Sequence, residues 1–433
     1  MNKKIKWACI QPLTGGMYIG ALEAIGYDAE WILSYEGLDV ANKDKDGNFT
    51  TVANEYNLLK WLEKNNHNVP YYKIQHRPMF DLNICEQNID ITLNGEDAIP
   101  DYKDIDLVVA VPVCSGLSNS TRAGSETKEA RNCNMLFLAN YVLSTIRPTV
   151  YCFENAPTLV AAKGDDVRLA LEDIAMKNGY SVLYYKTDTV LHHNCQRRPR
   201  TFVIFFKWEG NGIQFPYTLG YENESMTIPE FFGKISENAP QHIGYEVKSA
   251  SHNYMVIDFL NYKYDDEWTK TFKSNLMHYL IKDNLINEFK EFITNSNKYN
   301  EKDVEKAIKY VDHIFYKKSL GMNYYSEDVC LFRDYFPSVQ FRNITNVMHY
   351  SGKRFCTIRE FLSMMGMPED FILYGNESNL NKIGQNVPAG TAKFIVKRIL
   401  NILENPNPQK RKEGDEIFNY LLEDNTKQKV SVC

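Results

Sequence analysis

The sequence lacks the features that mark membrane and secreted proteins. Its 433 residues contain no apolar run that approaches the length needed to span a bilayer. The apolar stretch that follows the basic first residues is too short for a secretion signal, and charged residues soon follow it. We therefore expect a cytoplasmic protein without membrane contact.

Regular cysteine spacing is also missing. The nine cysteines are scattered and include no Cys-x-x-Cys pair, which is typical of a reducing compartment and argues against a disulfide framework or a metal site. Strong positive charge is absent as well, since the formal net charge is −6. Any contact with nucleic acid must therefore come from a local basic face.

Two domains are expected from the length, and the first shows a clear pattern. Strands alternate with helices, which predicts an α/β fold with a parallel, doubly wound sheet. The predicted strands are 5–10, 31–35, 105–111, 149–153, 181–186 and 201–206, and the predicted helices are 17–25, 128–146 and 165–178. Ligands bind such sheets just beyond the carboxyl ends of the strands.

The pattern changes after residue 208. We assign 1–208 to the first domain and 209–345 to a second, smaller one, with an irregular stretch over 209–268 and helices over 268–318. Thr357 and Glu360 form a capping box that predicts the start of a helix. A last helix is expected from Pro388 to about residue 403, and we expect the tail 405–433 to be mobile.

Two reactive side chains directly follow predicted strands. Cys114 ends an apolar strand and begins a loop of small and polar residues. A lone cysteine is more often an inert buried residue, but such a loop can expose a sulfur and close over a substrate. Glu154 ends the next strand, where a carboxyl group held in place can share a proton with a ring nitrogen.

An arginine cluster completes the set. Gln196-Arg197-Arg198-Pro199-Arg200 leads into the last strand. Arginine runs are usually solvated, but alternation along a strand puts Arg198 and Arg200 on the same side, facing one pocket. A thiolate, an acid and guanidinium groups suit attack on an electron-poor ring, so we interpret the chain as a pyrimidine-modifying enzyme.

A nucleoside-containing cofactor is suggested by two further features. Gly15 and Gly16 lie between a strand and a helix, where a plain tight turn is the simpler interpretation. Glu36 follows the next strand, at a position where an acid can hold the hydroxyls of a ribose.

These pieces, in this order, resemble the DNA cytosine-5 methyltransferases, which use S-adenosylmethionine. That family's motifs are Phe-x-Gly-x-Gly-Gly, Pro-Cys-Gln, Glu-Asn-Val, Gln-x-Arg-x-Arg, Thr-x-Arg-Glu and Gly-Asn-x-Val. The similar positions here are Gln11 to Gly16, Pro112 to Ser118, Glu154 to Ala156, Gln196 to Arg200, Thr357 to Glu360, and Gly384 to Val387. The resemblance covers most of residues 5–208 and 350–404.

The chain departs from the family pattern in two places. Gln11 and Leu13 replace the phenylalanine and the first glycine of the cofactor loop. Val113 and Ser115 replace the residues on either side of the nucleophile. The departures affect the shape of the expected cofactor pocket more than the nucleophile.

The resemblance implies a Rossmann-like S-adenosylmethionine-dependent methyltransferase sheet, a target-recognition domain over 209–345 and a return segment, 346–404, that completes the catalytic domain. It implies that Cys114 attacks carbon 6 of a flipped cytosine in double-stranded DNA and that carbon 5 is methylated. Glu154, Arg198 and Arg200 complete the catalytic set. The expected cofactor-binding residues are Gly15, Gly16, Glu36, Asp90 and Asn386, and the expected nucleic-acid contacts are Ser118, Arg122, Arg131 and Gln196.

Other functions stay open. A tRNA cytosine-5 methyltransferase of similar fold is one, although its second domain would be shorter. A catalytically silent DNA-binding homologue is another, kept open by the altered first motif. Transfer of a group other than methyl is a weaker option. We expect a monomer from a phage or a bacterial restriction-modification system.

Overall fold

The computed structural model describes most of the chain. The described residues are 4–35, 55–75, 92–93, 102–112, 117, 127–207, 219, 226–265, 267–271, 276–322, 345, 347–352, 354–375 and 380–404. Cys114, Glu36, Asp90, Ser118 and Arg122 lie outside these residues, as does the tail 405–433, and Arg131 is placed only as part of a helix backbone.

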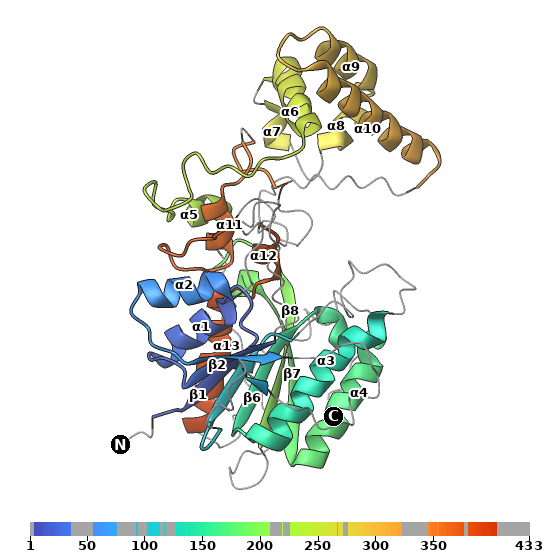
Figure 1. Cartoon of the computed structure of the whole chain (residues 1–433). Coiled ribbons are helices and arrows are strands. Elements are labelled where there is room, and N and C mark those ends of the chain that lie inside the picture. The colour runs from blue at the N-terminus through green and yellow to red at the C-terminus, as the bar shows by residue number, and fades with distance from the viewer. Residues whose placement is uncertain are drawn as a thin grey trace.

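The described strands form one eight-stranded sheet in the order β4-β3-β2-β1-β5-β6-β8-β7 (Figure 1). The strands are β1 (Trp7–Ile10), β2 (Trp31–Tyr35), β3 (Tyr71–Gln75), β4 (Thr92–Leu93), β5 (Leu107–Ala110), β6 (Val150–Asn155), β7 (Tyr180–Asp188) and β8 (Pro199–Lys207). The predicted α/β class is confirmed.

Strand direction differs from the prediction in one place that matters for the site. β3, β2, β1, β5 and β6 are mutually parallel, as expected. β8 is antiparallel to both β6 and β7, so the prediction of a parallel sheet was wrong there. The physical reason is the short connection 189–198, which contains no helix that could carry the chain back to the opposite edge of the sheet.

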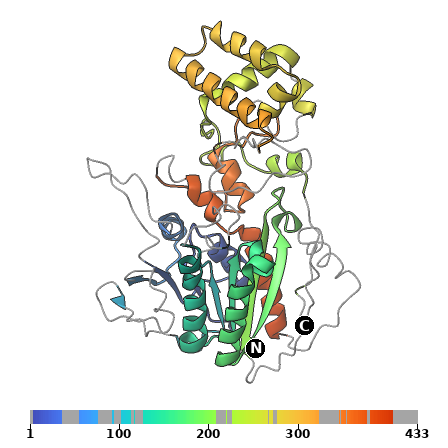
Figure 2. The same cartoon turned by 90° about the vertical axis from the view of Figure 1, so that its right-hand side faces the viewer.

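Helices cover both faces of the sheet (Figures 1 and 2). α1 (Gly16–Ile25) and α13 (Ala389–Glu404) pack on one face, and α3 (Thr127–Tyr141) and α4 (Asp165–Asn178) pack on the other. Alternate residues of β1 serve the two faces: Trp7 and Cys9 belong to the first core, whereas Ala8 and Ile10 belong to the second. A π-helix, Val142–Ile146, extends α3 toward β6.

The last described helix packs against the first. A Cβ atom at Gly20 of α1 would lie 2.4 Å from the carbonyl oxygen of Ala389 and 2.6 Å from the Cβ of Ala392. Glycine therefore permits the close approach of α13. The predicted last helix is confirmed. It packs beside α1 on the sheet, although the two helices are far apart in the sequence.

A helical unit lies beyond the carboxyl ends of the parallel strands (Figure 1). It contains α6 (Ser251–Tyr264), α7 (Glu267–Thr271), α8 (Leu276–Lys282), α9 (Ile286–Thr294) and α10 (Glu301–Ser319). Helices over 268–318 were predicted correctly. The prediction of an irregular stretch over 209–268 was wrong for 251–264, where α6 buries Met255, Val256, Phe259 and Leu260 at helical spacing within a polar, tyrosine-rich sequence. Residues 209–218 and 220–225 lie outside the described residues.

Shorter helices lie between this unit and the sheet. They are α2 (Tyr56–Lys64), α5 (Ile228–Phe232), α11 (Ile358–Met364) and α12 (Leu380–Gln385). The predicted capping box is present: the Thr357 amide donates to Glu360 at 2.8 Å, and the Glu360 amide donates to Thr357 at 3.2 Å. None of the helices described is both long and apolar enough to cross a membrane.

Candidate active site

The ends of β5 and β6 lie side by side, and both strands are wholly buried. β5 leads through Pro112 into the segment that carries Cys114, and β6 ends with Glu154 and Asn155. Parallel pairing places these two strand ends at the same edge of the sheet. The cysteine and the glutamate thus follow neighbouring strands, as the sequence indicated.

Glu154 forms an ion pair with Arg200. The Arg200 Nε lies 2.7 Å from the Glu154 Oε1, and the glutamate side chain is only 6% exposed. The contact exists because β8 runs antiparallel to β6 and brings its first residues beside the last residues of β6, with Glu154 opposite Phe202. A strand in the parallel direction would put Arg200 at the other edge of the sheet.

Burial shifts the protonation of this carboxyl group. Loss of solvation raises the pKa of Glu154 above its ordinary value, and the nearby charges of Arg200 and Arg198 oppose that rise. The carboxyl is therefore held by a cation yet remains easier to protonate than a solvated glutamate. Such a group can accept or share a proton with a ring nitrogen.

Arg198 has a different set of contacts from Arg200. It is 2% exposed, and its Nη2 donates to the carbonyl oxygens of Gly384 at 2.8 Å and Asn386 at 3.1 Å. Its backbone amide donates to Asp188 at 2.7 Å. Arg198 thus ties the start of β8 to the segment before α13, while Arg200 faces the glutamate.

Gln196 also connects the start of β8 to a distant part of the chain. It is completely buried, its Nε2 donates to the carbonyl of Met364 at 2.9 Å, and its amide donates to Asn194 at 2.8 Å. Asn194 Nδ2 donates to the same Met364 oxygen at 2.7 Å. The structure therefore gives Gln196 a bracing role between the β7–β8 connection and α11, and its expected contact with nucleic acid stays a prediction.

The glycine pair is shaped by distant parts of the chain. The Gly16 amide donates to Asn386 Oδ1 at 2.8 Å, and a Cβ at Gly16 would lie 1.8 Å from the carbonyl oxygen of Val387. Gly15 has a φ of 112°, and a Cβ there would meet Leu58 of α2 at 2.9 Å. Asn386 therefore supports the turn after β1, and the glycines are required for packing.

Gln11 is a feature that the sequence did not single out as a site residue. It directly follows β1, has a φ of 51°, and is fully buried. Its backbone amide donates to Leu33 at 2.8 Å, but neither polar atom of its side chain has a hydrogen-bond partner among the described residues. Burying an amide side chain without hydrogen-bond partners costs free energy. Gln11 follows the strand that lies between β2 and β5, where the strand order reverses, and ligands bind such sheets at this point.

Asp188 is a second residue that sequence reasoning missed. It ends β7, is buried, and accepts hydrogen bonds from the Arg198 amide and from Arg197 Nε at 3.4 Å. Burial raises its pKa, with the Arg198 amide and Arg197 opposing the rise. Its only sequence signal was its place at the end of a strand. Within the described residues, no group of three His, Cys, Asp or Glu side chains is arranged to hold a metal ion.

Comparison with known proteins places the chain in a family. The model of the C-5 cytosine-specific DNA methylases matches residues 61–401. A curated relative, the Type II methyltransferase M1.HphI of Haemophilus parahaemolyticus, is 20% identical over 342 residues, which cover 78% of this chain and 80% of the relative.

Solved structures are similar at low identity. The Entamoeba histolytica methyltransferase EhMeth is 12% identical, with 93% of this chain and 98% of that chain covered and a TM-score of 0.49. The S. pombe Dnmt2 methyltransferase is 13% identical, with 93% and 99% covered and a TM-score of 0.46. Since the family model spans well over half of the sequence and agrees with the resemblance of the motifs, the chain belongs to the C-5 cytosine-specific DNA methylase family.

Proposed function

We propose that this protein transfers a methyl group from S-adenosylmethionine to carbon 5 of a cytosine in double-stranded DNA, through a covalent adduct with Cys114. The observation that carries the proposal is the buried pair of Glu154 and Arg200 at the end of β6, beside the strand that leads into Cys114. The family supports cytosine carbon 5 as the acceptor.

The residues after β1 fit a cofactor of this class. Gln11 offers a buried donor and acceptor without partners, and Gly15 holds a turn at the carboxyl end of a central strand. We assign cofactor binding to Gln11, Gly15 and Gly16, with Glu36 and Asp90 as further predicted contacts. Asn386 acts through the Gly16 amide, to which it is bonded. When bound, the cofactor supplies an electrophilic methyl group.

The target base must leave the duplex stack to reach the end of β5. The Cys114 thiolate adds to carbon 6 of the ring, and Glu154 shares a proton with the ring nitrogen, so that the negative charge of the addition is spread over the ring. Arg200 holds the carboxyl group in place. Carbon 5 would receive the methyl group as its bond to the sulfonium sulfur breaks, leaving the cofactor as a thioether. Loss of the carbon 5 proton to water would then let the double bond re-form and the Cys114 sulfur leave.

Arg198 acts as a positioning residue in this scheme. The bond from its amide to Asp188 holds the end of β7, and its side-chain contacts with Gly384 and Asn386 hold the segment before α13. Through Asn386 the same tie reaches the turn at Gly16. Arg198 therefore links the start of β8, the strand that carries Arg200, to the turn that we assign to the cofactor.

Domain assignments follow the same scheme. Residues 1–208 and the return segment 346–404 form the catalytic domain, and 209–345, which includes the helices α6 to α10, forms the domain that recognises the target. The packing of α13 on α1 supports the return segment. Ser118, Arg122 and Arg131 are proposed contacts with the nucleic acid, since a loop that closes over an extruded base meets the phosphate backbone.

DNA is our preferred substrate over tRNA because the matching family is that of DNA methylases. The test is incubation of the purified protein with S-adenosylmethionine labelled in its methyl group and either unmethylated genomic DNA or total tRNA. We expect label in DNA, recovered as 5-methylcytosine, and none with Cys114→Ala. Cys433→Ala is the matched control and should keep full activity.

Three outcomes contradict the proposal. Label that enters only tRNA shows that RNA is the substrate. Absence of label in both, from a folded protein that still binds DNA, identifies a catalytically silent homologue. If the product is a cytosine modified by a group other than methyl, the cofactor assignment is wrong.

A further inference from the structure

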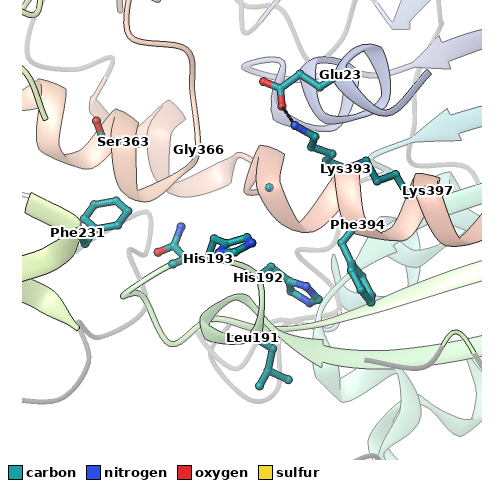
Figure 3. Close-up of a pocket in the computed structure, with 12 residues that line it drawn as sticks. Glu23, Leu191, His192, His193, Phe231, Ser363, Gly366, Lys393, Phe394 and Lys397 are labelled. Carbon is teal, nitrogen blue, oxygen red and sulfur yellow. Dashed lines mark hydrogen bonds and ion pairs between the residues drawn. The ribbon is translucent and has the colours of Figure 1, made fainter. Parts of the chain in front are cut away.

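A cavity of about 440 Å³ lies beside the β7–β8 connection (Figure 3), and neither Glu154 nor Arg200 is among the residues that line it. Its walls come from that connection, from α13, and from the ends of α1, α5 and α11. None of the roles proposed above uses it. Its volume is in the range of sites that hold small organic ligands, and it is several times larger than a single phosphate ion requires.

Basic side chains gather around this cavity in a chain that is acidic overall. Lys393 and Lys397 come from successive turns of α13, and His193 comes from the connection. Two lysines four residues apart on a helix repel each other, so having both at these positions slightly lowers the stability of α13. Among the residues that line the cavity, Glu23 is the only acid, and it pairs with Lys393 at 2.8 Å.

Lys397 is the cation available for a ligand. Its side chain is exposed, and it has neither an ion pair nor a hydrogen bond among the described residues. Lys393 is partly neutralised by Glu23, but an ammonium group has three donors and keeps others for a second acceptor. Figure 3 shows both lysines on α13, with Lys393 directed toward Glu23.

His192 supplies a buried polar atom without a partner. Its side chain is 5% exposed, its Nε2 lies 2.8 Å from the Thr187 hydroxyl, and its Nδ1 has no hydrogen-bond partner in the part of the chain that the structure describes. Burial lowers the pKa of His192 to about 3, so the ring is neutral at physiological pH. When Thr187 donates to Nε2, the proton lies on Nδ1, which then needs an acceptor.

Aromatic surface lies beside these donors. The Phe394 ring centroid is 4.4 Å from that of His192, and Phe231 forms another part of the wall. A ligand that satisfies the whole lining needs an anionic group for the lysines and a flat, largely apolar group for the rings. We propose that this cavity binds a phosphate-bearing nucleotide unit, either a free nucleotide or one unit of a nucleic-acid chain.

The position of the cavity suits either source. The connection leaves β7 and enters β8 at the edge of the sheet where β6 ends, which is the edge that carries Glu154. Asn194, which lines the cavity, is hydrogen-bonded to Met364 and to Gln196. Gln196 lies two residues before Arg198 in the sequence. A ligand here would lie beside Asn194, whose hydrogen bonds help to hold the residues that precede Arg198. The inference itself does not depend on the proposed methyl transfer.

The test measures binding of thymidine monophosphate and of thymidine by titration calorimetry. Saturating S-adenosylhomocysteine is present throughout, so that the predicted cofactor site cannot account for the heat. A duplex of oligo(dA) and oligo(dT), which contains no cytosine, is titrated in parallel at several salt concentrations. The variants are Lys397→Glu and Lys393→Gln. Lys177→Glu, an exposed position in the last turn of α4 on the other face of the sheet, is the matched charge control.

We expect Lys397→Glu to weaken the monophosphate about tenfold, with a smaller loss for Lys393→Gln and none for Lys177→Glu. Thymidine should bind weakly and equally to all four proteins. This result identifies a free nucleotide as a ligand. If the monophosphate does not bind but Lys397→Glu lowers the salt slope of duplex binding by about 1, and Lys177→Glu does not, the ligand is a backbone phosphate.

The inference is overturned if the lysine variants change neither the monophosphate affinity nor the salt slope. Equal binding of thymidine and its monophosphate to the unmodified protein overturns it as well, because the phosphate then contributes nothing. The variants lie on the surface or replace one polar group by another, and their melting temperatures show whether each is folded.

Discussion

The Nε atom of Arg200 lies 2.7 Å from Oε1 of Glu154. Arg200 is near the start of β8 and Glu154 is near the end of β6, and the two strands run in opposite directions. Reversal of β8 is what brings them together at one edge of the sheet. A buried carboxyl group beside a guanidinium, next to the strand that leads into Cys114, is the arrangement on which the proposed chemistry depends.

Arg200→Ala should destabilise the protein by about 3 kcal/mol, because it leaves the Glu154 carboxyl group buried without its cation. Arg200→Lys keeps the charge but loses the planar fork and should cost less. Denaturant unfolding at neutral pH gives both values. If the alanine variant is as stable as the unmodified protein, the pair does not hold the carboxyl group in the way described.

His192 should make stability depend on pH. Burial lowers its pKa to about 3, against about 6.5 in the unfolded chain, so the unfolded state binds the proton more readily. Its contribution is therefore complete above pH 6.5 and is lost as the pH falls toward 3, by about 1.4 kcal/mol per pH unit. In His192→Gln the free energy of unfolding should fall less steeply over that range.

The neighbouring His193→Gln provides the control for this measurement. His193 is exposed, and its replacement should leave the slope between pH 6 and pH 4 unchanged. Equal slopes for His192→Gln and the unmodified protein would show that His192 is protonated in the folded state.

Gln11→Met should separate stability from cofactor binding. Removing a buried amide whose polar atoms have no partner should raise the stability of the ligand-free protein by about 1–3 kcal/mol. The same change should weaken S-adenosylmethionine about tenfold, as judged by calorimetry, since a hydrogen-bonding group is lost from the proposed site.

Gln241→Met is the matched control for this split. Gln241 donates to the Leu373 carbonyl and accepts from the Leu373 amide, each at 2.8 Å, so its replacement should lower stability and leave cofactor affinity unchanged. If the Gln11→Met protein binds S-adenosylmethionine with unchanged affinity, Gln11 does not contact the cofactor.

Gly16→Ala tests the contact between the first turn and the return segment. The new methyl group would lie 1.8 Å from the Val387 carbonyl oxygen, so overpacking should cost about 1–3 kcal/mol and should also weaken cofactor binding. Gly26→Ala, with a φ of 90° and nothing within 4 Å of the new atom, should cost about 1 kcal/mol through backbone strain alone. Calorimetry should find weaker binding only for Gly16→Ala, and an equal loss in both would contradict the proposal.

The sequence predicted the strand ends that form the site because apolar runs with a polar terminus are local signals. The ends of β5 and β6, the capping box at Thr357 and the helix α13 were all predictable in this way. The cysteine at 114 and the expected cofactor acids at 36 and 90 lie outside the described residues.

What the sequence did not reveal depends on contacts between distant segments. Alternation along β8 is the same in either direction, so periodicity gave no sign that the strand is reversed. Gly16 was expected to bind the cofactor, but the atoms that forbid a side chain there belong to Asn386 and Val387, some 370 residues later. The carbonyls that bind Arg198 likewise have no local signal, and Asp188 has only its place at the end of a strand.

The most direct test of the central claim is covalent trapping on DNA in which every cytosine is replaced by 5-fluorocytosine, since fluorine at carbon 5 blocks the final loss of the proton and the choice of sequence no longer matters. With S-adenosylmethionine present, we expect a complex that survives denaturation and digests to a peptide joined to the base through Cys114, and none from Cys114→Ala. A stable adduct in Cys114→Ala, or one that maps to another cysteine, would contradict the account.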